Sequence, residues 1–258
     1  MNQCYTVPIT WQVESFEMKR VDGRASDELR PIKINLGYQT FAEGSALIEL
    51  GLTRVLCSVS MEDRVPNFLK GQGTGWVTAE YAMLPRSTLT RTPRSVSPER
   101  VSGRNQEIQR LIGRSLRAVT DLAALGERTF TVDCDVLQAD GGTRTAAITG
   151  GYVALSVALH TLKKQGTLSS IPLKGAVAAT SVGVVGREVL LDLCYEEDFR
   201  AAVDFNVVMT DKGDFVEIQG TAEGKPFSKE TTDTVLALAE KGIKQLFKVQ
   251  KAALAGLD

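Results

Sequence analysis

The sequence predicts an α+β fold built from two similar halves. Three observations support this class: runs of β-type residues open each half, a long apolar helix pattern closes the first half, and an amphipathic helix pattern closes the second. Strands followed by a helix, met twice in one chain, are typical of α+β architecture, although no residue-level repeat joins the halves. With 258 residues, of which 43 % are hydrophobic, the chain can bury a full core.

The first half opens with strand signals near Ile34. Two β-rich runs, Ala46–Leu50 and Arg54–Ser60, flank a turn that begins at Gly51. The segment Gly71–Trp76 is rich in glycine, but its spacing differs from that of a dinucleotide-binding loop and a strand-like run follows it. We therefore expect a hairpin, a turn and a further strand in this part of the chain.

A basic region follows these strands. Between residues 86 and 117 the chain has eight arginines and two acidic residues, although its net charge is -1. Residues 88–102 are rich in Ser, Thr, Pro and Arg without apolar periodicity, which predicts an exposed loop. The next helix pattern places apolar residues on one face: Ile108, Leu111, Ile112, Leu116 and Val119. Arg110, Arg114 and Arg117 fall on the opposite face, which favours a solvated or subunit-contact surface over RNA contact.

The segment Asp133–Gly151 predicts a strand, a Gly-Gly-Thr-Arg turn and a helix start. A helix start offers unpaired N–H groups and the positive end of a dipole, and glycines let a phosphate approach the backbone. The Thr143 hydroxyl and the planar Arg144 guanidinium can donate further hydrogen bonds to phosphate oxygens. A plain glycine turn before a core helix is the alternative interpretation.

The second half follows a helix pattern over Thr145–Lys164, which is apolar around most of its circumference and should be buried. Residues 176–195 read as a hairpin that turns near Gly186, and residues 205–220 as another that turns near Lys212. An amphipathic helix over Thr231–Leu254 ends the pattern.

Two carboxylates, Asp198 and Asp204, stand at the ends of a short link between two predicted strands. In phosphate chemistry one carboxyl can protonate a leaving oxygen, and a pair of carboxylates can hold Mg²⁺. The alternative is that both are polar turn residues, because aspartate is common in turns.

Other chemistries find little support in the composition. The chain has one histidine, which disfavours Ser-His-Asp, Cys-His and His-rich metal sites. Its four cysteines are far apart and include no C-x-x-C pair, which suits a reducing compartment. We expect no segment to approach the ~20 apolar residues of a membrane span and expect a cytoplasmic protein.

Five stretches occur in the order found in one known family. They are DGRASDELRPI from Asp22, GWVTAEYAMLPRST from Gly75, SGRNQEIQRLIGRSLRA from Ser102, DCDVLQADGGTRTAAITG from Asp133, and NVVMT with VEIQGTAEGKPF between Asn206 and Phe227. Together they resemble bacterial ribonuclease PH. The similarity runs from about Val21 to the C-terminus. We expect residues 1–20 to be a flexible extension and residues 21–258 to form a single ribonuclease PH domain.

The resemblance implies a duplicated βαβα core like the ribosomal protein S5 domain 2-like fold, assembled as a homo-hexamer built from dimers. It also implies a phosphate-dependent 3′-to-5′ exoribonuclease. Such an enzyme trims transfer RNA precursors and other RNA 3′ ends, releases nucleoside 5′-diphosphates, and adds nucleotides in reverse. Inorganic phosphate would be the co-substrate and Mg²⁺, or another divalent cation, the cofactor.

The resemblance also implies roles for individual residues. Residues that would bind the attacking phosphate are Arg104, Gly142, Thr143 and Arg144. Asp198 and Asp204 match the catalytic acidic pair and would hold the metal. Arg86, Arg91 and Arg94 match arginines that hold the transfer RNA stem.

Two other functions remain open at this point. One is a non-catalytic RNA-binding ring subunit of the exosome-core type, which would lack the full set of phosphate-binding and acidic residues. The other is an enzyme like polynucleotide phosphorylase, which fuses two such cores with extra RNA-binding domains.

Overall fold

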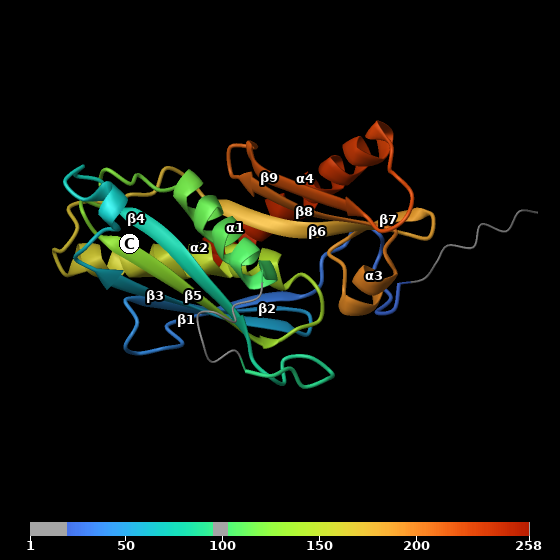
Figure 1. The fold of residues 1–258 in the computed structure, drawn as a ribbon, viewed down its shortest axis with the longest axis horizontal. Helices are drawn as coiled ribbons and strands as arrows, with labels where there is room; N and C mark the ends of the chain where they lie inside the picture. Colours follow the sequence, from blue (N-terminus) through green and yellow to red (C-terminus); the bar gives the residue numbers. More distant parts are fainter. Residues whose placement is uncertain (1–19, 95–102, 258) are drawn as a thin grey trace, which may run out of the picture.

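The computed structural model describes residues 20–94 and 103–257, which form two β-sheets and four α-helices (Figure 1). The first sheet has the strand order β1 (Ile32–Leu36), β2 (Gly44–Leu50), β3 (Thr53–Glu62), β5 (Thr129–Gln138) and β4 (Trp76–Met83). Its neighbours are antiparallel except β4 and β5, which are parallel and are connected through helix α1 (Gly103–Ala118). A short 3₁₀ helix, η1 (Asn67–Leu69), precedes β4.

The second sheet is wholly antiparallel. Its strand order is β7 (Glu188–Leu191), β6 (Val177–Val185), β8 (Val203–Thr210) and β9 (Phe215–Ala222). A short helix, α3 (Tyr195–Arg200), lies between β7 and β8, and the long helix α4 (Lys229–Leu254) follows β9. The two halves therefore share the order of strands then helix, but only the first contains a parallel pair.

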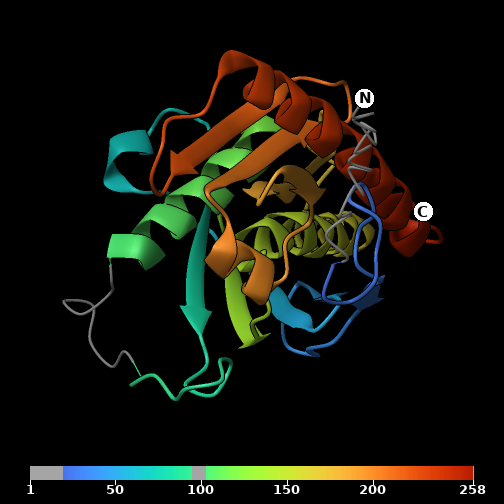
Figure 2. The same cartoon turned by 90° about the vertical axis from the view of Figure 1, so that its right-hand side faces the viewer.

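Helices α1 and α2 (Thr143–Lys164) lie between the two sheets, and α4 covers the outer face of the second sheet (Figure 2). Successive residues of β6 divide between these layers because side chains alternate across a strand. Val177 and Ala179 belong to the core around α2, whereas Ala178 and Val182 pack with α4 residues such as Val235. The order of layers is sheet, helices, sheet, helix.

The predicted strands and the three long helices are confirmed, with shifts of a few residues at their ends. Residues 88–94 form a largely exposed loop, as expected, while residues 95–102 lie outside the described part. The short link expected between two strands lies between β7 and β8, but it contains a helix. Residues 195–200 are helical, so Asp198 lies on α3, and Asp204 lies within β8 rather than at its border.

The flexible extension expected over residues 1–20 is wrong for its last residue. Arg20 is buried, and its Nε and Nη2 donate to the two carboxylate oxygens of Glu197, each at 2.7 Å. Residues 1–19, and with them most of the expected extension, lie outside the described part. Arg20 therefore belongs to the folded part of the chain, because its ion pair with Glu197 holds it there.

The expectation that no segment resembles a membrane span is wrong for α2. This helix is long and apolar enough to cross a membrane by length and composition, but 83 % of its most apolar stretch is buried inside the fold. Both sheets contact it, so its apolar circumference reflects a central position in the core.

The face of α1 that carries Arg110, Arg114 and Arg117 was expected to be solvated, and it is only partly exposed. Arg110 and Arg114 are exposed, but Arg117 is half-buried, with its guanidinium 4.2 Å from the ring centre of Trp76. Its Nη1 donates to the Val77 carbonyl oxygen at 2.8 Å. Burial, and then the charge of Arg114, lower the pKa of Arg117. This arginine therefore joins α1 to β4 by cation–π and hydrogen-bond contacts.

Candidate active site

The Gly-Gly-Thr-Arg turn lies where β5 leaves the first sheet and α2 begins. Gly142 precedes the helix in the left-handed region at φ 65°, and no described side chain caps the helix start. Gly141 has φ 74°, and a Cβ at this position would collide with the Leu193 carbonyl oxygen. Both glycines are required by backbone conformation or close packing. The first-turn N–H groups thus remain available to an anion.

Two residues hold this turn in place, Thr53 at the start of β3 and Arg30 just before β1. The buried Thr53 hydroxyl donates to the Gly141 carbonyl oxygen at 2.7 Å and accepts from the Asp140 N–H at 2.9 Å. Arg30 donates to the carbonyl oxygens of Asp140 and Gly141. The backbone of the turn is therefore fixed by side chains more than 80 positions away, as the separation of 88 between Thr53 and Gly141 shows.

Each long inner helix places an arginine at its second residue, Arg104 on α1 and Arg144 on α2. The Arg144 Nη1 donates to Gln219 Oε1 at 3.2 Å, and Gln219 Nε2 donates to Glu107 Oε1 at 3.2 Å. Gln219 lies on β9, so these contacts connect α2, α1 and the second sheet. Arg104 is exposed, which leaves its guanidinium accessible to a ligand.

Tyr81, a buried residue of β4, is a site residue that pattern reasoning missed. Its hydroxyl lies 2.8 Å from Thr143 Oγ1, and either oxygen can donate. Burial raises the pKa of Tyr81, although the bond to Thr143 and the charges of Arg104 and Arg144 lower it. The Thr143 hydroxyl thus has a protein partner that orients it, and a tyrosine within the stretch GWVTAEYAMLPRST was the available signal.

The acidic side of the site comes from the second half. Asp198 lies on α3 and Asp204 on β8. Burial raises the pKa of Asp198, against the lowering charges of Arg104, Arg144 and Arg30. Burial, and then the charge of Asp198, raise the pKa of Asp204. Residue 198 is still accessible to solvent, so the raised pKa reflects partial removal of water around its carboxyl.

These electrostatic couplings place the two arginines and the two aspartates close together. The charge of Arg144 acts on Tyr81, Asp198 and Asp204, and the charge of Arg104 acts on Tyr81 and Asp198. Figure 2 shows α3 beside the start of α2, where the Tyr195 N–H donates to Asp140 Oδ1 at 3.1 Å. Four predicted residues from four separate elements thus surround one region.

The three predicted RNA-binding arginines lie on the loop after β4. Arg86, Arg91 and Arg94 are exposed, and the Arg86 Nη1 donates to the Leu89 carbonyl oxygen at 2.8 Å. The loop starts next to the glycine turn, because the Ser87 carbonyl oxygen accepts from the Ala139 N–H at 2.8 Å. Arg94 also lowers the pKa of Asp135 on β5, against the larger effect of burial.

Metal-binding capacity at the site is limited to two carboxylates. Within residues 20–94 and 103–257, no group of three or more His, Cys, Asp or Glu side chains is arranged to hold a metal ion. Asp198 and Asp204 supply oxygen donors only. That donor set suits Mg²⁺, which uses one or two carboxylates and completes its shell with water and substrate phosphate.

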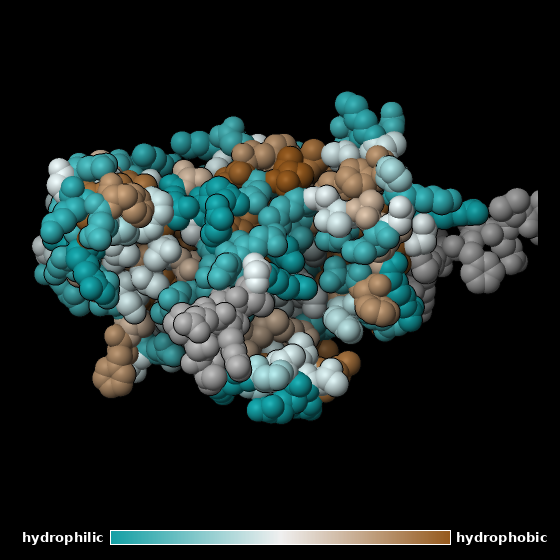
Figure 3. All heavy atoms as spheres, viewed as in Figure 1, coloured by the Kyte–Doolittle hydropathy of each residue, from teal (hydrophilic) through white to brown (hydrophobic). Residues whose placement is uncertain are grey.

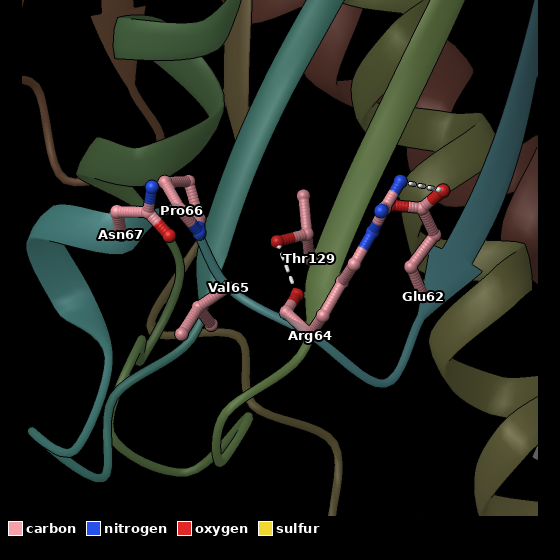
Figure 4. Close-up of a pocket in the computed structure, with 6 residues that line it drawn as sticks. All are labelled: Glu62, Arg64, Val65, Pro66, Asn67 and Thr129. Carbon is pink, nitrogen blue, oxygen red and sulfur yellow. Dashed lines mark hydrogen bonds and ion pairs between the residues drawn. The ribbon is translucent and has the colours of Figure 1, made fainter.

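A pocket elsewhere lies at the opposite end of the first sheet from the glycine turn (Figure 4). Its charged residues already pair with each other, since the Arg64 Nε and Nη2 donate to the Glu62 carboxylate at 2.9 and 3.0 Å. The Thr129 hydroxyl donates to the Arg64 carbonyl oxygen at 2.7 Å. The pocket therefore offers no free charge to a ligand and is not the candidate site.

The molecular surface differs in hydropathy between α1 and the edge strand β9. Figure 3 shows a mostly hydrophilic surface over α1 and a gathering of hydrophobic atoms over β9. Phe215 and Ile218 of this edge strand are 45 % and 42 % exposed.

Comparison with known proteins gives matches along most of the chain. The models for domains 1 and 2 of the 3′ exoribonuclease family match residues 28–160 and 175–242. Two relatives named Ribonuclease PH, from two strains of Dehalococcoides mccartyi, are 64 % and 63 % identical to this chain. The alignments cover 91 % of this chain and 97 % and 98 % of the relatives.

Solved structures share the fold at low sequence identity. A chain of the Archaeoglobus fulgidus exosome with RNA bound to the active site superposes with a TM-score of 0.76 at 22 % identity, covering 90 % of this chain and 92 % of that chain. A chain of an archaeal exosome core superposes with a TM-score of 0.72 at 21 % identity, covering 90 % and 91 %.

Proposed function

The chain belongs to the ribonuclease PH family of 3′ exoribonucleases and is a phosphorolytic enzyme of that class; from this premise we propose how its residues act. Inorganic phosphate attacks the last phosphodiester of a transfer RNA precursor or another RNA 3′ end. One bond forms between a phosphate oxygen and the phosphorus, and the bond from phosphorus to the 3′-oxygen of the preceding ribose breaks. The products are a nucleoside 5′-diphosphate and an RNA shortened by one nucleotide.

The observation that carries the proposal is the grouping of Arg104, Arg144 and the uncapped α2 start opposite two aspartates. A phosphate anion approaching a diester anion is opposed by charge repulsion. Two guanidinium groups and a helix start offset that repulsion and orient the nucleophile. The Thr143 hydroxyl, oriented by Tyr81, donates a further hydrogen bond.

The aspartates serve the leaving group in this proposal. The departing 3′-oxygen needs a proton, and a carboxyl whose pKa is raised keeps its proton to a higher pH than an ordinary aspartate. One of Asp198 and Asp204 donates that proton. The other stays ionised, since neighbouring carboxylates disfavour simultaneous ionisation.

Asp198 and Asp204 are also the residues that would hold the divalent cation, for which we propose Mg²⁺. The ionised carboxylate of the pair would be the direct ligand, because one carboxylate suffices for Mg²⁺ when water and substrate phosphate complete its shell. When bound there, the cation would neutralise negative charge on the phosphate oxygens.

We propose that Arg86, Arg91 and Arg94 hold the transfer RNA stem. Their exposure, and the proximity of their loop to the glycine turn, support this role. Contacts to backbone phosphates position an RNA without reading its sequence, and they weaken as salt rises.

We also propose a homo-hexamer, built from dimers, in the cytoplasm. Family membership and the exposed apolar Phe215 and Ile218 on an edge strand support assembly. Cys57 and Cys134 face each other across β3 and β5 as free thiols, which suits a reducing compartment. Light scattering on purified protein tests the assembly state.

A non-catalytic ring subunit is the less favoured function. Such a subunit does not need phosphate-binding and acidic residues together, whereas this chain has Arg104, Arg144, Asp198 and Asp204 in one region.

The test incubates purified protein and Mg²⁺ with a transfer RNA that carries extra 3′ nucleotides, with and without inorganic phosphate, and separates the products by chromatography. We expect nucleoside 5′-diphosphates only when phosphate is present. Asp204→Asn should stop release while RNA still binds, and Asp214→Asn in the exposed β8–β9 turn is the matched control. Monophosphates formed without phosphate would indicate hydrolysis, and RNA binding without release would support the non-catalytic subunit.

A further inference from the structure

Four charged side chains behind the site are almost completely removed from solvent. Arg20, Arg30, Asp192 and Glu197 are 5 %, 3 %, 0 % and 4 % exposed. Charged residues are seldom buried this deeply unless they are paired. These four residues, called here the buried ion cluster, form two pairs. Arg24 lies beside both pairs, with Nη1 3.5 Å from Asp192 Oδ2 and Nη2 3.8 Å from Glu197 Oε2.

The first pair connects the start of the described chain to α3. Arg20 makes a two-pronged contact with the Glu197 carboxylate, at 2.7 Å for each bond, and its Nη2 also donates to the Asp192 carbonyl oxygen at 3.0 Å. Glu197 Oε2 accepts from the Cys194 N–H at 3.0 Å, which caps α3. Glu197 directly precedes Asp198 on α3. The contacts that fix the Glu197 carboxylate therefore also fix the short helix that carries Asp198.

The second pair reaches the glycine turn. Arg30 Nε and Nη2 donate to the Asp192 carboxylate at 2.9 and 2.7 Å, and the Arg30 backbone N–H donates to Asp192 Oδ2 at 2.8 Å. The same guanidinium donates to the Asp140 and Gly141 carbonyl oxygens. Asp192 adopts φ 54°, the only non-glycine residue with positive φ in the described part. One arginine therefore ties the phosphate turn to the segment that leads into α3.

A role in stability alone explains this arrangement poorly. A buried ion pair contributes little net stability, because the cost of desolvating both charges largely offsets their attraction, and well-packed apolar residues often do as well. Directional, two-pronged contacts do fix geometry. The two sides of the active site come from different halves of the chain, and these contacts directly join the segments that carry them.

We propose that the buried ion cluster is a positioning device, in which Arg20 and Glu197 orient α3 with Asp198 while Arg30 and Asp192 hold the phosphate-binding turn. This inference rests on the proposed function. Arg20 lies before residue 28, where the match to the family model begins. Arg20 therefore acts as a positioning residue from before the matched segment, without touching the substrate.

The experiment separates geometry from stability with paired neutral replacements in the full chain. Arg20→Met and Glu197→Gln are made singly and together, as are Arg30→Met and Asp192→Asn, where asparagine tolerates the positive φ. The exposed pair Lys229 and Asp233, joined at 2.7 Å on α4, is changed to Met and Asn as the matched control. Melting temperature, kcat, and the KM values for phosphate and RNA are measured for each protein.

Single replacements leave one buried charge without its two-pronged partner, and Arg24 stays 3.5 to 3.8 Å from the two carboxylates. They should therefore lower the melting temperature, and the double replacements should recover most of that loss. The Arg20 and Glu197 double variant should still show kcat lowered about 10- to 100-fold with little change in KM for phosphate. The Arg30 and Asp192 double variant should raise KM for phosphate about tenfold. Replacing the control pair should change neither kcat nor KM for phosphate.

Recovery of kcat together with melting temperature in the first double variant would overturn the proposal and leave a merely structural cluster. If a double variant does not fold, Arg20→Lys provides the same test. It keeps the charge without the two-pronged contact, so normal folding with lowered kcat is expected, and unchanged kcat would overturn the proposal. Lack of phosphorolysis by the unmodified chain would refute the proposed function instead.

Discussion

At the scale of single residues, the two candidate phosphate-binding arginines occupy positions that are unfavourable for helix stability. Arg104 and Arg144 are the second residues of α1 and α2, where the positive end of the helix dipole repels a cation. This placement costs on the order of 0.3–1 kcal/mol per residue near a helix end. Anion binding explains the cost, because the arginine and the helix start then act on the same ligand.

Replacing Arg144 by alanine tests this role. We expect kcat to fall about 100- to 1000-fold, as is typical when a charge-stabilising donor is lost, with the fold intact by circular dichroism. Arg110→Ala, at an exposed position of α1, is the matched control. Near-normal rates for Arg144→Ala at saturating phosphate would contradict the assigned role.

Replacing Tyr81 by phenylalanine tests the orientation of Thr143. The change removes one hydroxyl, leaves Thr143 Oγ1 without that partner, and should cost about 1 kcal/mol of stability. We expect KM for phosphate to rise about three- to tenfold, since the Thr143 hydroxyl loses its fixed orientation. Tyr38→Phe, at a residue that is 56 % exposed, serves as the control. Unchanged phosphate kinetics for Tyr81→Phe would remove Tyr81 from the site.

At the scale of secondary structure elements, the parallel pair of β4 and β5 has an acidic outer face. Alternate residues of β5 are buried in the core, and the residues between them include Asp133 and Asp135. Glu80 on β4 lies directly opposite Asp133. Burial, and then the charges of Glu80 and Asp135, raise the pKa of Asp133 to about 6. The ionised form of Asp133 is thus disfavoured in the folded protein.

The raised pKa of Asp133 predicts that the variant Asp133→Asn is more stable than the wild type, by an amount that depends on pH. The folded pKa of about 6 lies above the ordinary aspartate value of 3.8, so wild-type stability falls relative to the variant as pH rises from about 4 to 6. Because the carboxyl is only about half-buried, screening reduces the gain at neutral pH to about 1 kcal/mol. Melting temperatures measured from pH 4 to 8 should diverge up to pH 6 and then run parallel. Equal melting temperatures throughout would contradict the raised pKa.

At the scale of the whole molecule, a net charge of -1 coexists with a concentrated basic loop. The loop of Arg86, Arg91 and Arg94 leaves the first sheet beside the phosphate turn, so an RNA stem bound there would have its 3′ end near the reacting groups. Because these few arginines supply the attraction to RNA phosphates, RNA binding should weaken strongly as salt rises and should also weaken when they are replaced.

Replacing Arg86, Arg91 and Arg94 together by alanine tests this arrangement. We expect weaker binding of intact transfer RNA, a shallower dependence of affinity on salt, and little change in turnover of a short single strand. Lys244, Lys248 and Lys251 on α4, changed together to alanine, provide a control of equal charge. Equal losses on both RNA substrates would contradict a stem-holding role.

Local patterns in the sequence determined most of the elements. The period of apolar residues predicted α1, α2 and α4, and the Gly-Gly-Thr-Arg turn was placed correctly between β5 and α2. Alternation and turn residues predicted the hairpins of both halves. The family resemblance pointed to Arg104. It also gave a catalytic role to Asp198 and Asp204, which their position between two predicted strands had already marked as candidates. These features can be predicted from the sequence because they depend on neighbours within a few residues or on whole motifs.

Only the tertiary structure decided which distant residues meet. It placed Tyr81 against Thr143, 62 positions away, and Arg20 against Glu197, 177 positions away. It also turned the short link before β8 into α3 and placed Arg117 over Trp76. No local pattern encodes such pairs, because each contact is fixed by the packing of sheets and helices formed from separate parts of the chain. The active site depends on both levels, with motifs that supply the chemistry and long-range contacts that set its geometry.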